Sequence, residues 1–144
     1  MIVVDANLLI YAYTASSSEH ASARRWVEAV FSGKDPVRIP WSTIHAFLRI
    51  TTQSSLFEKP YTIADAASIV ESWMEQPAVA VLEQGDRYWS IFRRLLRDSQ
   101  IRGSLVMDAH LAALSLEHGG TLFTTDKDFA RFENLRVTNP LKSK

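Results

Sequence analysis

Four aspartates stand at positions where carboxylates could bind a metal ion. Asp5 follows the β-branched run 2–4, and Asp126 and Asp128 follow a later apolar run. Asp108 lies in a largely apolar segment, where an unpaired buried carboxylate would be costly. Carboxylates held close together repel one another, and a divalent cation relieves that repulsion. Oxygen ligands in a chain without Cys favour Mg²⁺ or Mn²⁺ over zinc. Such a site suits phosphodiester hydrolysis, in which one or two metal ions activate water and stabilise the leaving oxygen.

Each of these aspartates also has a simpler structural interpretation. Asp5 and Asp126 can be N-caps, a position at which Asp is strongly favoured. Asp128 would then lie in the first turn of a helix, where a negative charge interacts well with the helix dipole. Asp108 can be a core residue bonded to a backbone amide or to an arginine. The residue types alone leave both interpretations open.

The elements around these residues predict how they are placed. Apolar runs and turn signals indicate five strands, and apolar residues at helical spacing indicate helices between them. Strands that alternate with helices favour an α/β fold of three layers, α/β/α, with a mostly parallel sheet flanked by helices. The carboxyl ends of parallel strands meet at one edge, so we expect Asp5 and Asp126 to share that edge. The strands are expected at 2–4, 37–39, 79–82, 121–124 and 135–137, and the main helices at 19–31, 42–50, 63–75, 85–97 and 104–118.

Composition narrows the class of protein. The chain has 144 residues, which predicts one domain over 1–144 with its own core. Sixteen basic and sixteen acidic residues cancel, so any surface that attracts nucleic acid must be local. No apolar run approaches the roughly 20 residues of a membrane span, so we expect no membrane association. The absence of Cys suits a reducing cytoplasm, which we take as the expected location.

Three motifs in order resemble the PIN-domain ribonucleases, and more closely the VapC toxins of bacterial toxin–antitoxin pairs. They are Val-Val-Asp5-Ala-Asn7-Leu-Leu, Met-Asp108-Ala-His-Leu-Ala-Ala and Thr124-Thr-Asp126-Lys-Asp128-Phe. Each motif is weak alone, but the ordered set is fairly specific and spans nearly the whole chain. The resemblance implies a PIN-like parallel sheet, RNA cleavage that depends on Mg²⁺ or Mn²⁺, a homodimer, and inhibition by a cognate VapB-type antitoxin.

The resemblance also implies roles for individual residues. Asp5, Asp108 and Asp126 would be metal ligands, and Asp128 an accessory catalytic acid. Asn7 and Thr124 would be polar supports around the metal or its water.

The chain departs from the family pattern at one place. The family usually has a Glu in the helix after the second strand, whereas the segment 36–57 contains no Asp or Glu. His45, Ala46 or Phe47 stands near that point, and His45 is a possible substitute ligand. A lone helical His is more often a surface or core residue than a metal ligand. Without the Glu, the sequence leaves open whether the site binds one metal ion or two.

Basic residues near the motifs are candidates for RNA contact, because phosphates require cations. The candidates are Arg49, Lys127, Arg93 and Arg97; the last two, with Arg94, can equally form a solvated helix face. Large apolar side chains in 85–97, including Trp89 and Phe92, fit a buried stripe or a dimer contact.

Two other functions remain as alternatives to a ribonuclease. A non-catalytic PIN-like module that binds RNA or protein would explain the missing helix acid. A phosphotransfer enzyme would also place an Asp after its first strand. A phosphatase of the haloacid-dehalogenase type would need a second Asp where Asn7 stands, and a receiver domain would need one after strand 79–82, so both fit poorly.

Overall fold

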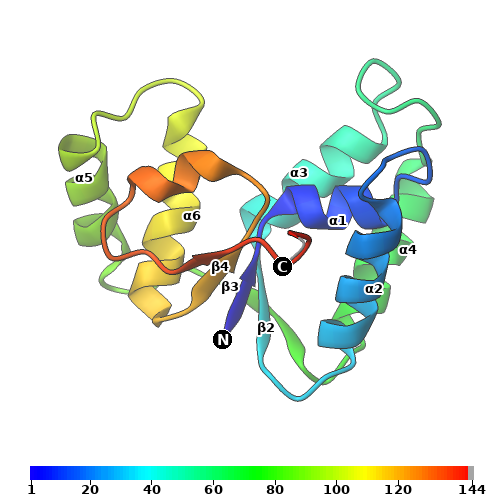
Figure 1. Cartoon of the computed structure of the whole chain (residues 1–144), viewed down its shortest axis with the longest axis horizontal. Helices are drawn as coiled ribbons and strands as arrows, with labels where there is room; N and C mark the ends of the chain where they lie inside the picture. The colour runs from blue at the N-terminus through cyan, green and yellow to red at the C-terminus, as the bar shows by residue number, and fades with distance from the viewer. Residues whose placement is uncertain (143–144) are drawn as a thin grey trace.

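The protein is an α/β structure built on one parallel sheet of five strands (Figure 1). It was obtained as a computed structural model, which describes residues 1–142; the last two positions of the expected domain lie outside that range. The strands are β1 (Ile2–Val4), β2 (Val37–Pro40), β3 (Val79–Leu82), β4 (Thr121–Phe123) and β5 (Val137–Thr138). The helices are α1 (Ala6–Ala12), α2 (His20–Phe31), α3 (Trp41–Thr51), α4 (Ile63–Met74), α5 (Tyr88–Asp98) and α6 (Leu105–His118), and η1 (Lys127–Arg131) is a 3₁₀ helix.

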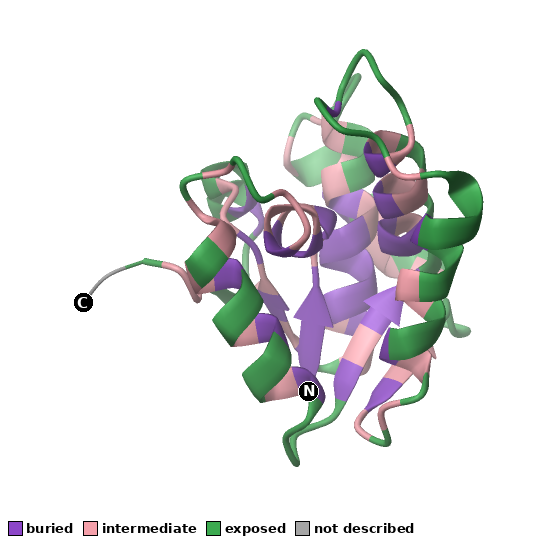
Figure 2. Ribbon diagram, turned by 90° about the vertical axis from the view of Figure 1, so that its right-hand side faces the viewer, coloured by how far each residue is buried: buried purple, intermediate pink, exposed green. Residues whose placement is uncertain are grey.

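Strand β1 lies at the centre of the sheet. The order is β3-β2-β1-β4-β5, and every neighbouring pair is parallel. Val4 is paired with Phe123, so β1 and β4 end side by side. All three residues of β1 are buried, as expected for a strand covered on both faces (Figure 2). The three-layer parallel fold expected from the sequence is therefore confirmed.

Alternate residues of β1 enter two separate hydrophobic cores. Ile2 and Val4 belong to a core with α1, α2, α3 and α4, whereas Val3 belongs to a core with α5, α6 and η1. Successive side chains of a strand point to opposite faces, so one short strand serves both cores. Figure 1 shows the two helix groups on opposite sides of the sheet.

Local signals place most helix ends correctly. Thr62 caps α4 by accepting a hydrogen bond from the Asp65 backbone N–H at 3.1 Å. Gly119 ends α6 with a φ of +66°, a left-handed conformation that glycine adopts readily. Thr121–Phe123 forms β4 as expected, and the last strand is shifted to Val137–Thr138.

Helix α5 differs from the expectation in two respects. It begins at Tyr88 rather than at Gly85, and in the segment before it the backbone N–H groups of Gly85 and Arg87 donate to the carboxylate of Glu117. Trp89 is 62% exposed, so its expected place in a buried stripe is wrong. Leu95 is the buried residue of this helix.

Within residues 1–142, no helix combines the length and the apolar character that crossing a membrane requires.

Candidate acidic site

The candidate site begins where β1 and β4 end together. Asp5 is the N-cap of α1, and its Oδ1 accepts the Ala6 N–H at 2.7 Å. Its other carboxylate oxygen accepts the hydroxyl of Thr124, the residue after β4, at 2.7 Å. Thr124 is buried and accepts hydrogen bonds from Asn7 Nδ2 at 3.2 Å and from the Asp126 N–H at 3.0 Å. The capping role and a place in the site are thus compatible for Asp5.

Three carboxylates gather beside this edge. Asp108 lies in the first turn of α6, and Asp126 caps η1 by accepting the Asp128 N–H at 2.9 Å. One carboxylate oxygen from each of Asp108, Asp126 and Asp128 lies within 4.8 Å of the other two. Asp5 is not in this group of three, but its charge acts on Asp108. The structure therefore brings the four predicted acids to one end of the sheet.

Electrostatics within the site raise two pKa values. Burial, followed by the charges of Asp126, Asp5 and Asp128, raises the pKa of Asp108 from 3.8 to about 6. Burial also raises the pKa of Asp5, although hydrogen bonds from Thr124 and Ala6 oppose the change. Mutual repulsion of carboxylates is a physical reason for a site to bind a cation.

The residues present fit a hard divalent cation. Carboxylate oxygens are the ligands that Mg²⁺ and Mn²⁺ prefer, and the three clustered acids supply them. The side-chain oxygen of Asn7 is buried and lacks a hydrogen-bond partner among the described residues. A buried acceptor without a donor is costly, so this oxygen suits an ion or its water.

A pocket of about 620 Å³ opens beside Asp5 and Asp108, and α3 forms its other wall. Ser42, His45, Ala46 and Arg49 line it from α3, at the spacing of one helix face. Phe47, in contrast, is fully buried in the core with α1 and α4. The pocket face of α3 therefore presents Ala46 and the imidazole of His45 where the family pattern has a carboxylate.

The basic residues predicted to contact RNA fall in different places. Arg49 lines the acidic pocket, and Lys127 is exposed between Asp126 and Asp128. Arg93 and Arg97 instead line a separate surface pocket on α5, together with Trp89, Ser90 and Arg94.

Comparison with known proteins decides the family. The family model described as "PIN domain" matches residues 2–135. The chain belongs to the PIN domain family. The ribonuclease VapC43 of Mycobacterium tuberculosis is 38% identical over 141 residues, which cover 98% of this chain and 96% of the relative. The ribonuclease VapC37 of the same species is 36% identical over 97% of each protein. The predicted resemblance to VapC ribonucleases is confirmed.

Solved structures agree on the fold of this PIN domain. VapBC-1 from nontypeable Haemophilus influenzae has a TM-score of 0.70 at 18% identity, covering 99% of this chain and 100% of that one. VapC20 of Mycobacterium tuberculosis, titled a toxin that cleaves the sarcin–ricin loop, has a TM-score of 0.64 at 20% identity, with coverages of 94% and 99%. At these identities the likeness shows the fold.

Sequence reasoning missed several polar residues of this PIN domain. Ser42 was expected only as the start of a helix, yet it lines the pocket. Tyr88 was expected only among the large apolar side chains of 85–97, and His110 had no role beyond its place in the second motif, yet the two bond to each other at 2.6 Å. Glu117 was read as part of a helix, although it is a buried carboxylate that holds the β3–α5 loop. Only Glu117 had a signal in the sequence. It is a charged residue at a helical position that is otherwise apolar, which indicates a buried carboxylate with partners.

Proposed function

We propose that this PIN domain is a metal-dependent endoribonuclease that hydrolyses RNA phosphodiester bonds as the toxin of a VapBC-type pair. The proposal covers the whole chain, 1–144, as one catalytic domain acting in the cytoplasm. The observation that carries it is the convergence of Asp108, Asp126 and Asp128, together with the pocket that Asp108 lines with Asp5. The names of relatives at 38% and 36% identity support the reaction class.

The roles proposed for the individual residues come from the family resemblance, and the cluster of Asp108, Asp126 and Asp128 supports them in part. Asp5, Asp108 and Asp126 would hold Mg²⁺ or Mn²⁺, with Asp128 as an accessory acid. The ion, when bound, would activate water and stabilise charge on the leaving oxygen. Thr124 keeps the Asp5 carboxylate in one orientation through its 2.7 Å hydrogen bond, and the Asp128 N–H does the same for Asp126.

The pocket also contains a group to bind the negative substrate. Arg49 lines the same pocket as Asp5 and Asp108 and extends from an exposed helix position. Its guanidinium is suited to a phosphate oxygen, and Lys127 is suited to the next stretch of RNA backbone. Arg93 and Arg97 would contact RNA only beyond the pocket, because they lie on another surface of α5.

The partners proposed are an antitoxin of the VapB type and a second copy of the chain. Solved structures with this fold include toxin–antitoxin complexes titled VapBC. The exposed Trp89 offers an apolar contact for either partner.

The alternative is a PIN domain that binds RNA without cutting it. It is favoured by one observation: the described face of α3 that lines the pocket carries no carboxylate. Such a protein would bind RNA through basic residues such as Arg49 and Lys127 but would not cleave it.

The test combines metal binding and RNA cleavage. Calorimetry with Mg²⁺ and Mn²⁺ is run on the wild type and on Asp5→Asn, Asp108→Asn and Asp126→Asn, with exposed Asp35→Asn as the matched control. We expect binding and cleavage of RNA by the wild type and the control, and loss of both in the three site variants. Cleavage that persists in excess EDTA would overturn the proposal. RNA binding without metal-dependent turnover would favour the alternative.

A further inference from the structure

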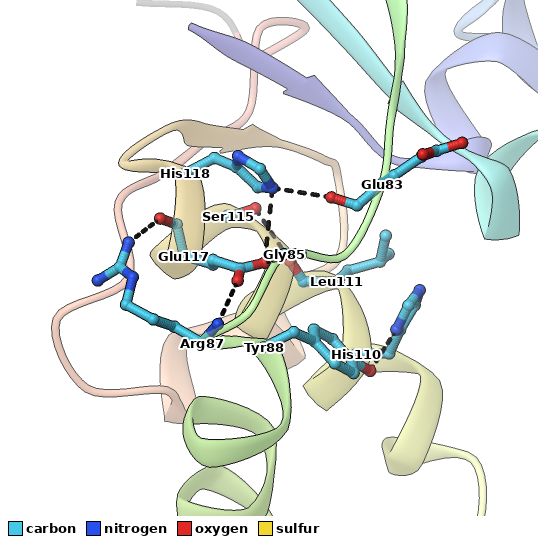
Figure 3. Close-up of polar contacts among 9 residues, drawn as sticks. All are labelled: Glu83, Gly85, Arg87, Tyr88, His110, Leu111, Ser115, Glu117 and His118. Carbon is cyan, nitrogen blue, oxygen red and sulfur yellow. Dashed lines mark hydrogen bonds and ion pairs between the residues drawn. The ribbon is translucent and has the colours of Figure 1, made fainter.

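Three side chains from three helices form a hydrogen-bonded chain that ends in the acidic pocket. The Tyr88 hydroxyl lies 2.6 Å from Nδ1 of His110, and Nε2 of the same ring lies 3.1 Å from the Ser42 hydroxyl oxygen. Tyr88 opens α5, His110 lies on α6 two residues after Asp108, and Ser42 lies at the start of α3. Figure 3 shows the phenol meeting one ring nitrogen, with the other nitrogen pointing away from Tyr88.

The direction of these hydrogen bonds follows from the donors available. The Tyr88 hydroxyl has one proton, and among the described residues its only hydrogen-bond partner is Nδ1 of His110. Burial raises the pKa of Tyr88, so the phenol keeps this proton. If Tyr88 donates to Nδ1, the ring carries its own proton on Nε2 and donates it to Ser42. The Ser42 hydroxyl then acts as an acceptor toward His110, and its own proton remains available to donate to another group.

A second set of contacts fixes Tyr88 in place. The carboxylate of Glu117 is buried and accepts the N–H of Gly85 at 2.8 Å and that of Arg87 at 2.9 Å. The Arg87 guanidinium donates to the Glu117 carbonyl. Figure 3 shows these contacts directly before Tyr88 along the chain. The start of α5 is therefore fastened to α6, and the phenol is held against His110.

Ser42 lines the pocket that also contains Asp5, Asp108 and Arg49. A phosphate that enters a pocket rich in carboxylates needs donors, because additional acceptors would repel it. Asp5 and Asp108 offer acceptors when ionised, whereas Ser42 and Arg49 offer donors. The helix that carries Ser42 begins there without a side-chain cap, so its first N–H groups add positive potential.

We propose that Ser42 donates a hydrogen bond to a non-bridging phosphate oxygen of RNA bound in the acidic pocket. His110 and Tyr88 are positioning residues. The Nε2–H of His110 donates to the Ser42 hydroxyl oxygen, so the Ser42 proton is directed into the pocket. This inference rests on the proposed function, because the phosphate is that of the RNA substrate.

The first experiment reads the tautomer without any turnover. Nitrogen NMR of the ¹⁵N-histidine-labelled, metal-free chain reports which ring nitrogen of His110 carries the proton, with His110→Gln used for assignment. We expect a proton on Nε2 in the wild type and a mixture of tautomers in Tyr88→Phe. A proton on Nδ1 in the wild type overturns the inference, because Ser42 would then donate to His110.

The second experiment measures affinity. Fluorescence anisotropy with a labelled, mixed-sequence single-stranded oligoribonucleotide is run in Ca²⁺, which replaces the catalytic ion. We expect Ser42→Ala to bind about tenfold or more weakly, since hydrogen bonds to charged groups are worth at least that much. Ser42→Thr keeps the hydroxyl and is expected to stay near wild type. Ser68→Ala is the matched control, because Ser68 is exposed on α4, away from the acidic pocket and from the arginines of α5.

The outcomes separate the two proposals. If the wild type binds and cuts RNA but Ser42→Ala binds as tightly, this inference fails and the proposed function stands. If the wild type binds no RNA, both fail. Circular dichroism establishes that Ser42→Ala is folded, and Ser42→Thr provides the comparison if it is not.

Discussion

Replacing Asp108 by Asn should stabilise the metal-free protein, although it removes a group proposed to bind the metal. In the folded chain the pKa of Asp108 is raised to about 6, whereas an unfolded aspartate titrates near 3.8. An increase of that size corresponds to about 3 kcal/mol of destabilisation by the ionised form. Asp108 is only partly buried and lines a pocket that opens to the surface, so solvent screening reduces the expected effect to about 1 kcal/mol.

The sign of the effect depends on pH. A carboxyl group with a raised pKa binds its proton more tightly when folded, so its contribution to stability is present below pH 3.8 and is lost as pH rises through 6. The amide side chain in Asp108→Asn does not titrate. The variant and the wild type should therefore match near pH 4 and differ by about 1 kcal/mol above pH 7, equivalent to about 3 °C in Tm.

Urea and thermal unfolding in excess EDTA at pH 4 and pH 7.5 measure this difference. Asp35→Asn, at an exposed position, is the control and should show no pH-dependent gain. Addition of Mg²⁺ should reverse the order at pH 7.5, because a ligand that binds only the folded wild type stabilises it. A variant that is less stable than the wild type at pH 7.5 in EDTA would refute the electrostatic reasoning.

Two further substitutions test the contacts around the site. Thr124→Val should lower the free energy of unfolding by about 1–3 kcal/mol and impair RNA cleavage, because the Asp5 carboxylate loses one of its two hydrogen-bond donors, the buried hydroxyl of Thr124. Exposed Thr138→Val is its control, and equal stability of the two variants in urea would contradict the role of the hydroxyl. Gly85→Ala should cost a similar amount, because a Cβ there would lie 2.8 Å from the Glu117 Oε2 that accepts the Arg87 N–H. Unchanged urea stability of Gly85→Ala would show that the Glu117 contacts can shift without cost.

The sequence predicted the position of Asp5 and Asp126 at one sheet edge. Apolar runs indicate where the strands end, and the carboxyl ends of parallel strands meet at the same edge. It could not place Asp108, since the position of a helix end over the sheet depends on packing of the whole chain. The start of α5 was misplaced for a related reason: the segment before it is held by Glu117, thirty residues further along the chain, whose carboxylate accepts the Arg87 N–H. The contact between Ser42 and His110 joins residues 68 apart and leaves no local signal.

The expected burial of Trp89 failed for a different reason. Helical spacing shows that a stripe of large apolar residues shares one side of α5, but it does not show how wide the covered face is. Leu95 is buried and Trp89 is 62% exposed on the same helix. A tryptophan at the margin of an amphipathic helix is therefore a position where sequence periodicity cannot separate core from surface.

The central place of β1 has a consequence for biosynthesis. Asp5 is synthesised before the rest of the site, and the hydroxyl that holds it belongs to a residue 119 positions later. Ribosomes add about 5–20 residues per second, so about 6–24 s separate the synthesis of the first site residue from that of its partner. Throughout that interval β1 lacks β4, its neighbour on one side, and Asp126 and Asp128 at the start of η1 do not yet exist. A nascent chain whose synthesis stalls before Asp126 therefore has no complete acidic site. The site can form only after the ribosome has added Asp126 and Asp128.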